Sequence, residues 1–235
     1  MRAALANLLD WRTAILADLL AGRRLRAHAV NLLTLMIVGA AAYGGVLGMW
    51  HGPRLALYCA VKFPLVLLLT TAVTIAFSWL AATLLGLHLT PGQVIALNLL
   101  ALGAAATLLA SLVPIAWLFT FSSPPPSAAE RTTHNLLYLM HTGFVAGCGL
   151  GGMRLLWMAL EQTRRPHHIV VAVFLIWIVT YALVGGEVAW ALRPFVGSVS
   201  RDYPVVFLRP DALHGNVYEF IWTDILPHLA ESMSK

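Results

Sequence analysis

Charged residues are scarce in this sequence: only 11% of its 235 residues are Asp, Glu, Lys or Arg, whereas 60% are hydrophobic. A soluble domain of this length cannot hide so much apolar surface, but a bilayer removes the need to hide it. We therefore expect a polytopic membrane protein. The net charge of +5 comes mainly from arginines that flank the apolar runs. That pattern is typical of membrane topology, so we expect no nucleic-acid binding.

Cysteine and catalytic motifs are also nearly lacking. Cys59 and Cys148 both lie in apolar runs without C-x-x-C spacing, so we interpret them as small core residues. There is no nucleotide-binding glycine loop, no G-x-S-x-G elbow and no H-E-x-x-H helix. We find no template for catalytic or metal-binding residues, which favours a protein that is not an enzyme.

Histidine is more abundant, with nine residues, and invites a haem hypothesis. Bis-histidine haem needs two imidazoles at matching depth on facing helices. Only His141 lies well inside an apolar run. Four others lie at the ends of runs: His28, His51, His88 and His134. We therefore predict no cofactor and keep a haem-binding electron-transfer subunit only as a weak alternative.

Five apolar runs are long enough to cross a bilayer as helices. We expect the spans at about residues 28–50, 65–87, 93–121, 134–160 and 169–192. Because Lys62 and Pro64 precede the second span, we interpret residues 55–64 as an interfacial or kinked start. Pro114 predicts a kink in the third span, and the proline-rich residues 122–133 predict an exposed linker.

The predicted fold class is an all-α membrane protein with three parts: an interfacial helix (1–27), a five-helix transmembrane domain (28–192) and an extramembrane tail (193–235). In residues 3–20 the apolar side chains gather on one side of a helix, with Asn7, Asp10 and Asp18 opposite. A helix lying in the membrane interface fits this pattern. A cleaved signal peptide is the weaker alternative, because charges interrupt its apolar core. Residues 216–230 predict a short amphipathic helix in the tail.

The arginines indicate an orientation. Three of them precede the first span and two precede the fifth, whereas the short outer loops hold only Arg54 and Arg131. Because cytoplasmic loops are enriched in Lys and Arg, we expect a cytoplasmic N-terminus and an extracytoplasmic C-terminus. In a bacterial host this predicts the inner membrane, with the tail in the periplasm.

Small residues in two spans predict close helix contacts. Gly44 and Gly48 in the first span have G-x-x-x-G spacing, and Gly143, Gly147 and Gly151 repeat it in the fourth. Such faces let helix backbones approach closely. We expect both faces to be tightly packed and suited to docking helices.

Lys62 and Glu187 are the two acid–base groups best placed within apolar runs. Each is costly to bury alone, and a pair would relieve the desolvation of both. We therefore predict a salt bridge between them, directly or through one water, near the outer boundary of the bundle. Arg193, about two turns from Glu187, could also snorkel outward. The pair is either a proton or ion relay or a structural clamp between helices, and we favour the clamp.

Four segments carry a resemblance to a known family: Leu57-Tyr-Cys-Ala-Val-Lys-Phe-Pro-Leu65, Trp190-Ala-Leu-Arg-Pro-Phe-Val-Gly-Ser198, Phe207-Leu-Arg-Pro210 and Gly215-Asn-Val-Tyr-Glu-Phe220. They resemble a poorly characterised family of bacterial polytopic inner-membrane proteins, over roughly residues 30–222. The family has no established activity, so the resemblance implies the architecture and no reaction. An amide or small polar residue is more usual in that family where Glu187 stands here.

The sequence thus favours a non-enzymatic integral membrane subunit or scaffold of a larger membrane complex. Its expected partners are the lipid bilayer and either other membrane subunits or further copies of the chain. A small transporter or channel subunit, with Lys62 and Glu187 near the permeation route, is the alternative.

Overall fold

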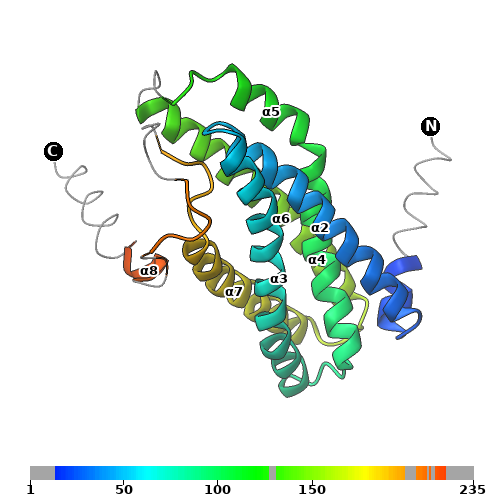
Figure 1. The fold of residues 1–235 in the computed structure, drawn as a ribbon. Coiled ribbons are helices and arrows are strands. Elements are labelled where there is room, and N and C mark those ends of the chain that lie inside the picture. The colour runs from blue at the N-terminus through cyan, green and yellow to red at the C-terminus, as the bar shows by residue number, and fades with distance from the viewer. Residues whose placement is uncertain (1–13, 127–130, 199–204, 211, 213–214, 221–235) are drawn as a thin grey trace.

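A computed structural model describes residues 14–126, 131–198, 205–210, 212 and 215–220. This part of the chain is all-helical and contains no strand (Figure 1). Five helices are long and apolar enough to cross a membrane, which confirms the predicted fold class. They are α2 (Leu25–Met49), α3 (Pro53–Leu84), α4 (Pro91–Ser111), α6 (Arg131–Glu161) and α7 (His167–Ala191). The shorter helices are α5 (Val113–Ser122) and α8 (Val217–Phe220).

The long helices alternate in direction, so the bundle has two distinct ends. At the upper end of Figure 1, α2 ends and α3 begins; at the lower end, α3 passes into α4 and α6 passes into α7, and α7 runs from there towards the left of the view. α4 is the most deeply buried of the five and packs against α2 and α6, while α3 joins α2 to α7. The Ala- and Leu-rich sequence of α4 suits this central position, because small side chains allow helices to pack closely on several sides.

The second span begins earlier than we predicted. Residues 55–64 are not a separate start, because α3 is one continuous helix from Pro53 that contains Pro64. Leu55, Cys59 and Lys62 are buried on it, so tertiary packing holds these turns helical. At 1.5 Å per residue its 32 residues span about 48 Å, longer than the ~30 Å hydrocarbon core.

The third predicted span is divided into two helices. α4 ends at Ser111, Leu112 caps it, and α5 begins at Val113, so the interruption lies two residues before Pro114. Proline has no N–H and its ring crowds the carbonyl four residues earlier, which disfavours an uninterrupted helix there. The start of α4 follows expectation, because Thr90 is the N-cap of a capping box with Gln93 and Pro91 is the first helical residue.

The N-terminal segment is packed onto the bundle. Residues 14–20 are helical, and Leu16 and Leu19 are fully buried. The side-chain amide of Gln93, on α4, donates a hydrogen bond to the carbonyl of Leu20. The predicted interfacial helix therefore has a helical second half in contact with α4, while residues 1–13 lie outside the described part of the chain.

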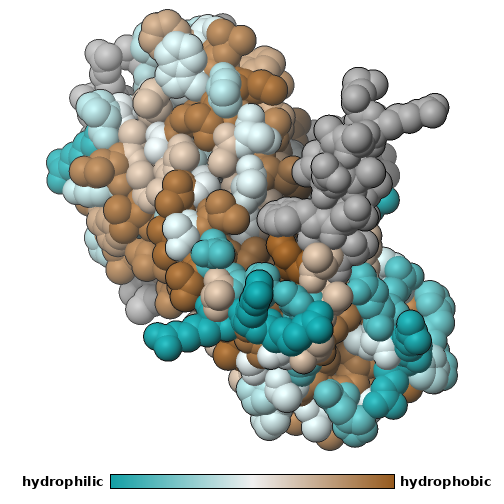
Figure 2. Space-filling view, turned by 90° about the vertical axis from the view of Figure 1, so that its right-hand side faces the viewer, coloured by the Kyte–Doolittle hydropathy of each residue, from teal (hydrophilic) through white to brown (hydrophobic). Residues whose placement is uncertain are grey.

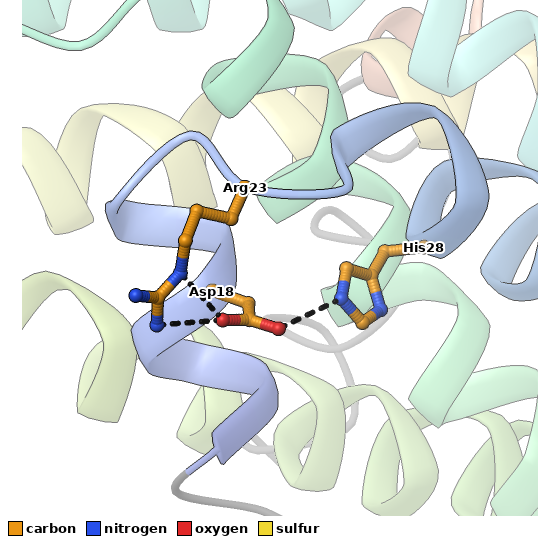
Figure 3. Close-up of polar contacts among 3 residues, drawn as sticks. All are labelled: Asp18, Arg23 and His28. Carbon is orange, nitrogen blue, oxygen red and sulfur yellow. Dashed lines mark hydrogen bonds and ion pairs between the residues drawn. The ribbon is translucent and has the colours of Figure 1, made fainter.

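Asp18 stabilises the turn between this segment and α2 through contacts with Arg23 and His28 (Figure 3). Its carboxylate lies 2.7 Å from Nη2 of Arg23 and 3.6 Å from Nε2 of His28. The hydrogen bond from Arg23 lowers the pKa of Asp18 below its ordinary value.

Figure 2 shows hydrophilic residues gathered over the lower part of this side of the molecule, with mostly apolar residues above them. This distribution is what a membrane boundary near the lower end requires.

Glycines of α2 lie at its closest contacts with neighbouring helices. A Cβ added to Gly48 would lie 2.6 Å from the carbonyl oxygen of Leu55 on α3, and one added to Gly44 would overlap the carbonyl of Cys59. The expected tight packing of Gly44 and Gly48 is therefore confirmed, and the neighbour is α3 of the same chain.

We predict that Gly48→Ala lowers the free energy of unfolding by about 1–3 kcal/mol, because the new methyl group forces α2 away from the α3 backbone. Unfolding in mixed detergent micelles measures this change. The matched control is Gly45→Ala, whose Cβ would lie 3.8 Å from Cβ of Ala60, an ordinary contact. That control should be neutral or slightly stabilising, and equal losses in both variants would contradict the packing account.

Candidate functional site

Lys62 is the most unusual side chain in the described part of the bundle. It is 0% exposed, and its ammonium donates a hydrogen bond of 3.2 Å to the carbonyl oxygen of Pro194, just after α7. The ammonium also lies 5.9 Å from the ring centre of Phe195 and 5.4 Å from that of Phe207. A carbonyl dipole and two aromatic faces therefore take the place of water around this charge.

The residues around Lys62 belong to the segments that carry the family resemblance. The thiol of Cys59 lies 3.1 Å from the carbonyl oxygen of Phe195, and the rings of Phe63 and Phe195 meet edge to face. Tyr58, on the outer side of α3, packs edge to face on Phe207. Segments 57–65, 190–198 and 207–210 thus meet in one place, which their separation in the sequence did not predict.

Two histidines hold the end of the segment that covers Lys62. Nδ1 of His51 lies 3.1 Å from the carbonyl oxygen of Ser198, and Nε2 of His134 lies 3.1 Å from that of Gly197. Since a carbonyl only accepts, these ring nitrogens carry the protons. Gly197 has φ 86° and a Cβ there would lie 2.7 Å from His51, so glycine suits both the backbone and the space.

Glu187 does not pair with Lys62. Both residues are described, and no ion pair joins them, so the expected direct salt bridge is wrong. Glu187 instead lines a shallow hollow beside α7, together with Asn216 and Tyr218 of the tail. The Tyr218 hydroxyl donates to the carbonyls of Ala182 and Leu183, and burial, followed by the charge of Glu187, raises its pKa.

Arg193 completes the C-terminal end of α7. Its guanidinium lies 3.7 Å from the ring centre of Trp190 and donates a hydrogen bond of 2.8 Å to the Trp190 carbonyl. A cation that binds a last-turn carbonyl stabilises the helix end. The three predicted charges thus have separate positions, with Lys62 under the segment after α7, Arg193 at the helix end and Glu187 beside the tail.

The glycines of α6 differ from those of α2. A Cβ added to Gly143 or Gly147 would meet nothing within 4 Å, so these two glycines pack against no neighbour in the described part of the chain. α6 approaches α4 through Gly152, whose added Cβ would overlap the carbonyl of Ala101, and through Gly151, beside Leu108. The backbone contact with α4 is at Gly152, on a different side of the helix, while Gly143 and Gly147 face outward.

Neutral polar groups link the helices elsewhere in the interior. The hydroxyl of Tyr43 on α2 is 2.8 Å from Nδ1 of His141 on α6, so this nitrogen of the buried histidine has a partner. Tyr181 on α7 donates to Asn98 on α4. Each of these groups finds a partner on another helix, as polar groups in a bilayer require.

We predict that Lys62 and Glu187 act independently. Lys62→Met should lower the free energy of unfolding by about 1–3 kcal/mol, since the Pro194 carbonyl loses its donor. With Glu187→Gln added, the two changes should sum to within about 0.5 kcal/mol. Unfolding of the wild type, both single variants and the double variant measures the coupling. A coupling energy well above about 0.5 kcal/mol would show that Lys62 and Glu187 interact with each other.

No model of a known protein family matches this sequence, and no characterised protein or solved structure matches it either. Two features of the chain itself therefore point to its function: the enclosed Lys62 and the open face of α6.

Proposed function

We propose that this protein is a non-enzymatic integral membrane subunit or scaffold that docks a helix of another membrane protein, or of a second copy, on α6. The observation that carries the proposal is the outward Gly143–Gly147 face. It combines G-x-x-x-G spacing with open space beside both glycines, and this combination permits close approach of a partner backbone.

Comparison within the chain supports this proposal. In α2, glycines lie directly against the backbones of other helices of the same chain: Gly39 against Ala106 on α4, and Gly48 against Leu55 on α3. Gly143 and Gly147 have the same small size but no neighbour. Large apolar residues flank them on the same side of α6, with Leu139 68% and Leu150 71% exposed. A partner helix would pack on the two glycines, between these leucines.

The surroundings of Lys62 favour a structural role over the transport alternative. Its ammonium is enclosed and engaged by a backbone carbonyl and two rings. No carboxylate pairs with it in the described part of the chain, which favours a structural role over an acid–base relay through Lys62 and Glu187. Lys62 acts as a clamp that keeps the segment after α7 on the bundle.

The cellular setting is part of the same proposal. The turn before α2, the first residues of α2 and the loop between α6 and α7, which together contain five arginines, lie at the lower end of Figure 1, and the start of α3, which contains Arg54, lies at the upper end. We assign the lower end to the cytoplasm of a bacterial cell and the upper end to the periplasm, since cytoplasmic loops are rich in arginine. The resemblance to a family of bacterial inner-membrane proteins agrees with this assignment.

We predict that Gly147→Leu releases the partner. The leucine side chain would hold the partner helix away, and a loss of about 1.4 kcal/mol lowers its affinity tenfold. Purification from native membranes in mild detergent, with the partner content measured per chain, tests this. Gly149→Leu is the matched control, because Gly149 also has open space beside it but faces about 200° away from Gly147. Equal partner content in both variants would contradict the docking face.

The orientation has its own test. A cysteine in place of the exposed Asn216 should react with a membrane-impermeant thiol reagent in intact spheroplasts, and one in place of the exposed Gln162 should not. The native thiols, Cys59 and Cys148, are buried and give little background. Labelling of Gln162→Cys with protection of Asn216→Cys would reverse the assignment.

A further inference from the structure

A cavity of about 340 Å³ lies between the helices, at a distance from the outward face of α6. Phe63 and Thr70 line it from α3, His141 from α6, and Tyr181 and Gly185 from α7. Phe195, in the segment that covers Lys62, also lines it. Its volume lies in the lower part of the range for small-molecule pockets.

The lining is mostly apolar and aromatic, with polar groups on two threonines, two tyrosines and His141, and no Asp, Glu, Lys or Arg lines it. Lys62 lies beside the cavity but turns its ammonium to Pro194. A site without a formal charge favours a neutral ligand, because an ion would lose its hydration without a counter-charge. The helices around it are spans, so such a ligand would come from the membrane.

Access to the cavity lies on the lipid-facing side of α6. Tyr138, Thr142 and Val145 line the cavity and are exposed on the outer surface. α6 packs mainly against α4 and much less against α7. A membrane-dissolved molecule therefore has a route between α6 and α7.

Thr70 supplies a free polar group at this site. It is 4% exposed, and its hydroxyl has no hydrogen-bond partner. The neighbouring threonines on α3 behave differently: the hydroxyl of Thr71 donates to Leu67, and that of Thr74 donates to Thr70. Those bonds satisfy a hydroxyl inside a membrane helix, so among the threonines of α3 only Thr70 has a hydroxyl without a partner.

Gly185 leaves room beside the hydroxyl of Thr70. A Cβ at Gly185 would lie 3.6 Å from Oγ1 and Cγ2 of Thr70, so a larger side chain would lie over this hydroxyl. Tyr181 and Nδ1 of His141 are already engaged by Asn98 and Tyr43. The free hydroxyl of Thr70 in a mostly apolar cavity suits an organic molecule with a polar end.

We propose that this cavity binds a neutral, membrane-soluble molecule whose carbonyl or hydroxyl group hydrogen-bonds to Thr70. A lipid quinone supplies a carbonyl, and a long-chain alcohol supplies a hydroxyl. Both have an uncharged polar end on an apolar body, and Thr70 can donate to the first or accept from the second.

Two neutral probes and one anion test the proposal on the purified full-length protein. The probes are decylubiquinone, 1-dodecanol and laurate, with binding followed by native mass spectrometry. At least one neutral probe should bind saturably at one per chain, and laurate should bind at least tenfold more weakly. Quinone binding alone identifies a carbonyl ligand, and dodecanol binding alone identifies a hydroxyl ligand.

Variants locate the binding. Gly185→Leu fills the cavity and should abolish binding, and Thr70→Val should weaken it roughly three- to tenfold, the effect of one hydrogen bond. Thr180→Val is the control, because its hydroxyl already donates to Ile176, and it should bind as the wild type does. Thermal unfolding of each variant verifies that it is folded. Saturable binding of neither neutral probe, equal binding of laurate, or full binding by a folded Gly185→Leu would overturn the proposal.

Discussion

The hydrogen bond from Lys62 to the Pro194 carbonyl connects the helix bundle to the chain that follows it. A buried ammonium needs partners, because its desolvation costs several kcal/mol. Here the partners are a carbonyl and two rings from segments after α7, so burial of the charge requires those segments to lie on α3. Phe195 then lines the interior cavity, and His51 and His134 bind the backbone beyond it. One buried charge thereby fixes the upper end of the molecule.

Much of the fold was predictable from the sequence, because the bilayer imposes a simple rule. A run of about 20 apolar residues must be a helix, since no water is present to satisfy its backbone. The spans, the capping box at Thr90 and the close contact at Gly48 all follow from such local features. The unbroken helix through Pro64 did not follow, because packing around Lys62 and not local sequence holds those turns.

The candidate site was predictable only in part. Lys62 was identified by its position in an apolar run, but its partner was not, because a backbone carbonyl leaves no signature in a sequence. Charge complementarity pointed to Glu187 instead, which lies beside Tyr218. The spacing of Gly143 and Gly147 predicts a helix-docking face without revealing which side of α6 meets α4. Gly152 makes that contact, and the surface shape of α4 determines which glycine of α6 does so.

The central claim is that the outward face of α6 contacts protein in the native membrane. A photoreactive amino acid at Leu150 tests it most directly, with the same label at Phe77, an exposed residue of α3, as the reference. After illumination of native membranes, the account predicts a protein adduct of one defined mass from position 150 and none from position 77. Only lipid adducts at both positions would contradict it.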